Sequence, residues 1–189
     1  MPEGQNGRLT IAHISDIHCG GPDFVPNLIE RAIIEINDLE PDIVICSGDL
    51  TTFGFKHEYA MAREYMNRIK CESVVVIPGN HDSRNVGYVH FEDMFGDRNS
   101  VLRCPGVTVV AVDSTEPDLD HGQIGRGRYA WIEEQFAGPA DLRVFVLHHH
   151  LLPVPGTGKR WWCRTKIRMS AGSANCSWIQ PYRPRPTCP

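Results

Sequence analysis

The sequence of 189 residues lacks long apolar runs, and this absence bears on where the protein resides. No stretch approaches the roughly 20 continuous apolar residues that a membrane-spanning helix needs. The N-terminal MPEGQNGRLTIAHIS lacks the apolar core of a signal peptide. The seven cysteines are odd in number and include no CxxC pair, which argues against a disulfide framework. We therefore expect a cytoplasmic protein with reduced thiols and no membrane partner.

Acidic residues are absent from the C-terminal segment 159–189. This segment holds seven of the 19 basic residues, three of the four tryptophans and three of the seven cysteines. Residues 1–158 accordingly contain 12 basic and 23 acidic residues, a net charge of −11. An acidic surface repels phosphate backbones, so we do not expect nucleic acid as a partner of this part. We predict two regions, a domain at 1–158 and a basic tail at 159–189.

Residues 1–158 alternate between strand-like and helix-like patterns. Continuously apolar, strand-like runs lie at 8–15, 42–48, 73–79, 107–114 and 142–150. Helical spacing of apolar residues occurs at 25–39, 56–69 and 127–136. Continuous apolar strands are typical of a sheet covered on both faces, and repeated βα units favour parallel strands. The pattern predicts a layered α/β fold with a mainly parallel sheet.

Polar side chains gather where these strands end. Four strands are followed by candidate ligands: Asp16 and His18, then Asp49, then Asn80, His81 and Asp82, then His148, His149 and His150. Sites in α/β sheets lie beyond the carboxyl ends of strands, so we expect these groups to meet at one edge. Mixed carboxylate, imidazole and amide ligands suit Mn, Fe, Co or Zn better than Ca or Mg. The sequence therefore predicts a shared metal site.

Each motif taken alone also has a structural explanation. A D-x-H or G-D pair at a strand end is common in turns, and consecutive histidines occur on protein surfaces. The G-N-H-D motif after a β-branched strand is a stronger signal, although Asn80, His81 and Asp82 could instead cap a helix at Ser83. The metal site is inferred from the joint occurrence of these motifs at four strand ends.

Four motifs carry a resemblance to a known family: HISDIH, SGDLT, IPGNHD and VLHHHLLPVPG. They resemble those of the calcineurin-like metallophosphoesterases, over roughly residues 8–158. The segments GDLTTFGFKHEYAMAREYM and AVDSTEPDLDHGQIGRGRYAWIEEQF are most similar to the class III cyclic-nucleotide and glycerophosphodiester phosphodiesterases. The resemblance implies an α-β-β-α sandwich that hydrolyses phosphate esters.

The resemblance also implies a metal-binding role for five residues. Asp16 and His18 would bind a first divalent ion. Asn80 and His148 would bind a second, and Asp49 would bridge the two. The ions would be Mn, Fe, Zn or Co. The family's H-H-x-x-x-P pattern sets the register that favours His148 over the histidine that follows it.

The expected reaction is hydrolysis of a small phosphate ester, with a diester favoured by the local resemblance. Two ions roughly 3.5–4 Å apart can hold a phosphate and convert a bridging water into hydroxide at neutral pH. His81 would protonate the leaving alkoxide, and Asp82 would orient its loop. A phosphatase or a nuclease uses the same ligands, and a truncated domain with one weak metal site would be inactive; both are alternatives.

One motif of the family is missing from the sequence. The family's G-H-x-H supplies a further ligand to each ion, but no histidine follows His150. Segment 159–189 shows no strand periodicity, so we expect domain 1–158 to lack its C-terminal third. An uncovered sheet face would then cause poor solubility or homo-oligomers. The tail itself is interpreted as a frameshifted or disordered end, or as a basic aromatic segment that binds nucleic acid or an anionic surface.

Overall fold

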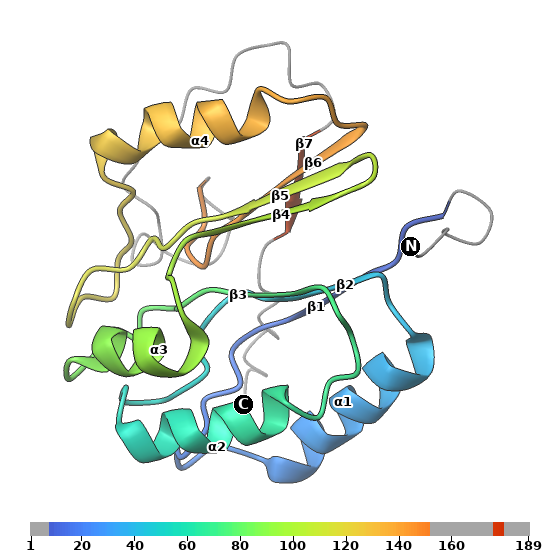
Figure 1. Ribbon diagram of the computed structural model, residues 1–189. Coiled ribbons are helices and arrows are strands. Elements are labelled where there is room, and N and C mark those ends of the chain that lie inside the picture. The colour runs from blue at the N-terminus through green and yellow to red at the C-terminus, as the bar shows by residue number, and fades with distance from the viewer. Residues whose placement is uncertain (1–7, 152–175, 180–189) are drawn as a thin grey trace, which may run out of the picture.

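Two β-sheets form the centre of the protein, in a computed structural model that describes residues 8–151 and the strand 176–179 (Figure 1). The first sheet is parallel and contains β1 (Ile11–Ile14), β2 (Ile43–Cys46) and β3 (Val74–Val76). The second contains, in this order, β4 (Ser100–Cys104), β5 (Val107–Ala111), β6 (Leu142–Val146) and β7 (Cys176–Ile179). In this second sheet β4 is antiparallel to β5, while β5, β6 and β7 are parallel.

Helices cover the outer face of each sheet (Figure 1). The first sheet carries α1 (Pro26–Leu39), α2 (Lys56–Met66) and α3 (Gly87–Phe95). The second sheet carries α4 (Tyr129–Phe136), which follows a 3-10 turn at Arg126–Arg128. The layers therefore run helix, sheet, sheet, helix.

Strand β2 shows how one apolar run serves two layers. All four of its side chains are fully buried. Val44 and Cys46 belong to the cluster formed with the helices, whereas Ile43 and Ile45 belong to the cluster between the two sheets. Successive side chains of a strand point to opposite faces, so a continuous apolar run supplies both.

The predicted alternation of strands and helices is confirmed, but α3 and β4 have no counterpart in the sequence prediction. Helix α3 has only 9 residues, and its N-cap, Val86, makes no side-chain capping hydrogen bond. The backbone at Asn85 and Val86 is left-handed instead. Strand β4 is half-buried along most of its length and lacks a continuous apolar run. Strand β4 thus lacks the signal by which the other strands were predicted, whereas α3 is no shorter than α4, which was predicted.

The expectation of an uncovered sheet face is wrong for the described residues. Ile45 and Val75 of the first sheet share a buried cluster with Val109 and Val144 of the second. The inner face of the first sheet is thus covered by β5 and β6. This removes the physical reason for expecting poor solubility or homo-oligomers from that face.

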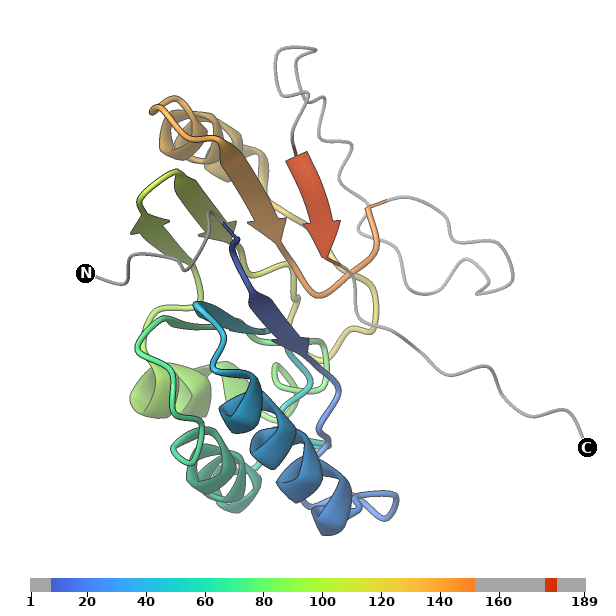
Figure 2. The same ribbon diagram turned by 90° about the vertical axis from the view of Figure 1, so that its right-hand side faces the viewer.

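Segment 159–189 contributes one strand, although its sequence shows no strand periodicity. Strand β7 lies within it and pairs with β6, with Cys176 opposite Arg143 (Figure 2). The remainder of the segment lies outside the described residues, so the interpretations of the tail and the boundary at 158 stay predictions. Within the described part of the chain, no helix has the length and apolar character that a bilayer crossing requires.

Candidate metal centre

The loops after β1 and β2 run side by side toward the candidate ligands. The N–H of Asp16 donates to the carbonyl of Gly48 at 2.9 Å, and the N–H of His18 donates to the carbonyl of Asp49 at 2.9 Å. Parallel pairing therefore continues past the end of both strands. It brings Asp16 and His18 next to Asp49, as the strand-end pattern predicts.

The Asp49 carboxylate lies between two groups of candidate ligands. Its Oδ2 is 3.5 Å from Nε2 of His18, which in turn is 3.9 Å from Oδ1 of Asp16. Its Oδ1 is 3.5 Å from Nε2 of His148 and accepts a hydrogen bond from the N–H of His81 at 2.9 Å. Asp49 is fully buried, and Oδ2 has no hydrogen-bond partner among the described residues. The two oxygens of one carboxylate thus face different sets of side chains.

His148 approaches Asp49 in a defined tautomer. Its Nδ1 lies 2.8 Å from the carbonyl oxygen of Ser47, which can only accept, so Nδ1 carries the proton. In the neutral ring, Nε2 then offers a lone pair. It faces Oδ1 of Asn80 at 3.1 Å and Oδ1 of Asp49 at 3.5 Å. Three acceptor atoms that converge in this way fit a bound cation.

His81 belongs to the same cluster. Its Nδ1 donates to the carbonyl of Thr52 at 2.7 Å, which leaves Nε2 available to the site. Its ring is edge-to-face with that of His18, with 4.6 Å between the centroids. One ligand atom from each of His18, Asp49 and His81 lies within 4.8 Å of the other two. These three residues therefore form a possible metal site in their own right.

Burial and neighbouring charges shift the pKa values of the cluster in different directions. Burial alone would raise the pKa of Asp49, but His148, His81 and His18 and the hydrogen bond from the His81 N–H lower it below its usual value. Burial alone would lower the pKa of His148, but the nearby Asp49 raises it overall. Burial lowers the pKa of His18, and this effect outweighs that of Asp49. The centre is therefore an ionised carboxylate surrounded by imidazoles.

Comparison with known proteins assigns the chain to a family. The sequence pattern of the calcineurin-like phosphoesterases matches residues 9–182. This chain belongs to the calcineurin-like phosphoesterase family. The resemblance carried by the four motifs is thereby confirmed, and the match extends beyond residue 158.

Curated relatives of this phosphoesterase include phosphodiesterases of the expected kind. A probable glycerophosphodiester phosphodiesterase of Arcobacter nitrofigilis is 31% identical over 127 residues, which cover 64% of this chain and 46% of the relative. A cAMP/cGMP dual specificity phosphodiesterase of Mycobacterium tuberculosis is 26% identical over 161 residues, which cover 76% of this chain and 50% of the relative. The chain spans about half the length of these curated relatives.

The layered fold is shared with a solved phosphatase. The purple acid phosphatase PPD1 from yellow lupin (Lupinus luteus) seeds superimposes with a TM-score of 0.58 at 16% identity. The match covers 76% of this chain and 30% of the lupin chain. A likeness at this identity concerns the fold alone, and it confirms the predicted α/β sandwich.

Three candidate ligands of the phosphoesterase have left-handed backbone conformations. The φ angle is 57° at Asp16, 53° at His18 and 54° at Asp49. Such angles cost a residue other than glycine roughly 1–2 kcal/mol. Backbone strain of this kind persists where surrounding contacts enforce it, and it is concentrated at functional sites.

Asp82 connects two of the ligand loops. Its fully buried carboxylate accepts hydrogen bonds from the N–H groups of Leu50 (3.0 Å), Thr51 (2.9 Å) and Gly79 (2.9 Å), and from the Thr51 hydroxyl (2.7 Å). Burial and the neighbouring Asp49 raise the pKa of Asp82 to about 7, against the lowering effect of these hydrogen bonds. Asp82 thus fixes the loop of Asp49 against the loop that begins at Gly79.

The consecutive histidines after β6 have different environments. His148 reaches Asp49, as described above. Nδ1 of His149 instead lies 2.8 Å from the hydroxyl of Ser114, which follows β5. Burial and the nearby His148 lower the pKa of His149 to about 3, so its ring is neutral. The structure therefore places only the first of these two residues at the centre.

Sequence reasoning does not identify several residues that shape this site. Ser47 and Thr52 act through their carbonyl oxygens, which set the tautomers of His148 and His81. A main-chain contact is compatible with almost any side chain, so it leaves no signal in the sequence. Asp120 contacts Asn80 across a long sequence separation and is likewise absent from the predicted set.

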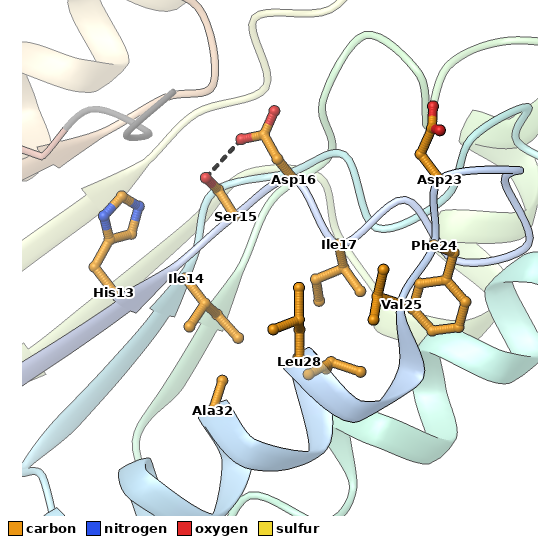
Figure 3. Close-up of a pocket in the computed structure, with 11 residues that line it drawn as sticks. His13, Ile14, Ser15, Asp16, Ile17, Asp23, Phe24, Val25, Leu28 and Ala32 are labelled. Carbon is orange, nitrogen blue, oxygen red and sulfur yellow. Dashed lines mark hydrogen bonds between the residues drawn. The ribbon is translucent and has the colours of Figure 1, made fainter. Parts of the chain in front are cut away.

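A pocket opens beside Asp16 (Figure 3). Its volume is about 390 Å³, within the range of small-molecule sites. Its apolar side is built by residues such as Ile14, Leu28 and Ala32, and Ser15 donates to Asp16 Oδ2 at 2.6 Å on its polar rim. Among the residues that the structure describes, no lysine or arginine lines it. The pocket therefore suits a neutral or cationic group rather than an anionic one.

Gly79 is predicted to be essential for the position of the central carboxylate. A Cβ atom at Gly79 would collide with Oδ1 of Asp49, although the backbone there does not require glycine. We expect Gly79→Ala to weaken Mn²⁺ binding by roughly 10- to 100-fold, because the carboxylate must move. Isothermal titration calorimetry measures this. Gly138→Ala is the matched control, since a Cβ there meets open space; equal Mn²⁺ affinity in both variants would contradict the prediction.

Proposed function

We propose that this phosphoesterase hydrolyses small phosphodiesters at a site that holds two divalent ions, drawn from Mn, Fe, Zn and Co. The observation that carries the proposal is the position of the Asp49 carboxylate. One oxygen faces His18, and the other faces His148. A carboxylate shared in this way can bridge two neighbouring cations, with Asp16 and Asn80 as further ligands.

Each side chain of the site has a distinct task in this proposal. Bound ions would neutralise phosphate charge and supply hydroxide from water at neutral pH. Asp49 is held in place by the N–H of His81. The carbonyl of Thr52 accepts from Nδ1 and orients the His81 ring; in the imidazolium form Nε2 carries the second proton, which it would pass to the leaving alkoxide oxygen and so return to the neutral ring.

Two observations favour a diester over a monoester. The relatives described above are named as phosphodiesterases. In addition, a diester carries two alcohol groups, and the pocket beside Asp16 offers one of them a neutral, partly apolar space. A monoester would leave that pocket unused.

The proposal is tested with substrates that differ in leaving group. We expect the Mn²⁺-loaded protein to hydrolyse bis(p-nitrophenyl) phosphate faster than p-nitrophenyl phosphate. We expect His81→Asn to lower kcat on the order of 100-fold for an alkyl diester, and less for the nitrophenyl diester, whose leaving group needs little protonation.

His57→Asn is the matched control, because His57 is an exposed residue stacked on Phe55 at the start of α2. It should leave both rates unchanged. A protein that holds Mn²⁺ but turns over neither ester would refute the proposal and favour the inactive-domain alternative. A monoester preference would favour a phosphatase instead.

A further inference from the structure

The amide of Asn80 has two ends that face different groups. Asn80 is fully buried. Its Oδ1 is 3.1 Å from Nε2 of His148, beside Asp49. Its Nδ2 donates to Oδ1 of Asp120 at 3.4 Å. Rotating the amide by half a turn would place its oxygen against the Asp120 carboxylate, where both atoms are acceptors. The Asp120 side chain therefore determines which end of the amide faces the centre.

The Asp120 carboxylate is itself held in place. Nη2 of Arg84 donates to the same Oδ1 of Asp120 at 2.6 Å. The loop that carries Asp120 is also attached to the chain around Arg84. The N–H of Asn85 donates to Oδ1 of Asp118 at 3.0 Å, and the N–H of Asp118 donates to the carbonyl of Ser83 at 3.4 Å. Three separate contacts thus fix the position of Asp120 relative to Asn80.

We propose that Asp120 is a positioning residue of the metal centre, which orients the Asn80 amide so that its oxygen is presented to an ion beside Asp49. The proposal rests on the proposed function for the identity of the bound group. Asp120 acts only through Asn80. It is half-exposed, so its role does not come from packing in the core. Removing a carboxylate that orients a metal ligand typically lowers the metal affinity 10- to 100-fold.

The test compares three variants of the full chain. Asp120→Ala removes the acceptor for the Asn80 amide. Asp120→Asn removes the charge but keeps one oxygen that can accept from both Asn80 and Arg84. Asp118→Asn is the matched control, because it neutralises a carboxylate in the same loop that does not contact Asn80, while its amide oxygen can still accept from the N–H of Asn85. Asparagine tolerates the left-handed backbone found at Asp118.

Two readouts separate orientation from general damage. The first is Mn²⁺ affinity and stoichiometry by calorimetry. The second is the side-chain NH₂ signal of Asn80 in NMR spectra of the metal-free protein, identified by its loss in Asn80→Ser. We expect Asp120→Ala to weaken the binding of one of the two ions roughly 10- to 100-fold. We also expect it to shift the NH₂ signal of Asn80 toward that of a solvent-exposed asparagine. We expect Asp120→Asn and Asp118→Asn to resemble the wild type in both.

The outcomes distinguish this inference from the proposed function. Unchanged affinity and an unchanged NH₂ signal in Asp120→Ala would overturn it. Equal losses in Asp120→Ala and Asp120→Asn would also overturn it, because charge rather than the acceptor atom would then matter. A wild type that hydrolyses no diester, but whose Asn80 signal and Mn²⁺ affinity depend on Asp120 as expected, would refute only the proposed function.

Discussion

Replacing Asp49 by asparagine is expected to abolish binding of both ions and nearly all diester hydrolysis. The neutral amide cannot bridge two cations, and the ions supply several kcal/mol of transition-state stabilisation, so activity should fall at least about 1,000-fold. The metal-free fold should survive, because asparagine keeps an oxygen for the N–H of His81. Its unfolding temperature should fall modestly, because the lowered pKa of Asp49 shows that His148, His81 and His18 stabilise the ionised carboxylate in the fold. Mn per chain, measured by plasma mass spectrometry after desalting, tests the first expectation.

The control for this variant lies at the other end of the same strand. Asp42 precedes β2, and its Oδ2 accepts a hydrogen bond from the N–H of Thr10 at 2.7 Å. Asp42→Asn also removes one negative charge but should retain both ions. A full complement of Mn in Asp49→Asn would refute the assignment of Asp49 as the bridge. Retention of one ion would mean that the two groups of side chains bind independently.

Replacing Asp82 by alanine is expected to cause the largest loss of stability. The substitution leaves the buried N–H groups of Leu50, Thr51 and Gly79 without their acceptor. Unpaired buried donors cost about 1–3 kcal/mol each, and partial relaxation should leave a net loss of about 4 kcal/mol in the free energy of unfolding. For a chain of this length the melting temperature should fall by about 8–16 °C. Thermal unfolding of the metal-free protein, followed by circular dichroism, measures it.

Asp93→Ala is the corresponding control, because Asp93 is an exposed acidic residue of α3. Its melting temperature should stay within about 2 °C of the wild type. Asp82→Asn should fall between wild type and Asp82→Ala, because its amide keeps one acceptor oxygen but turns its NH₂ toward other donors. A melting temperature of Asp82→Ala equal to that of the control would show that the two loops hold together without this carboxylate.

The candidate site could be predicted from the sequence because its residues lie at strand ends. Asp16, Asp49 and Asn80 each follow a continuous apolar run, and parallel strands deliver such residues to one edge. The structure does bring all three to the surroundings of the Asp49 carboxylate. His81 also lies there, and its closeness to His18 was not evident from the sequence.

The arrangement of the layers was harder to predict from the sequence. A continuous apolar strand signals that both faces are covered, but it does not say by what. Residues 107–111 and 142–146 belong to a second sheet that covers the first. For this reason the expectation of an exposed sheet face was wrong. Strand β7 shows the same limit, since it pairs with β6 although segment 159–189 shows no strand periodicity.

By itself, the sequence determined the family, the α/β layering and the side chains that meet at the edge of the sheets. These depend on local patterns, namely apolar runs and the polar residues that end them. Only the tertiary structure decided the tautomers of His148 and His81, the connection made by Asp82 and the contact between Asn80 and Asp120. Each of these depends on which backbone or side-chain atoms lie opposite one another after folding. Residues 29 to 101 positions apart leave no shared pattern in one sequence, because a hydrogen bond constrains their positions in space and not their spacing along the chain.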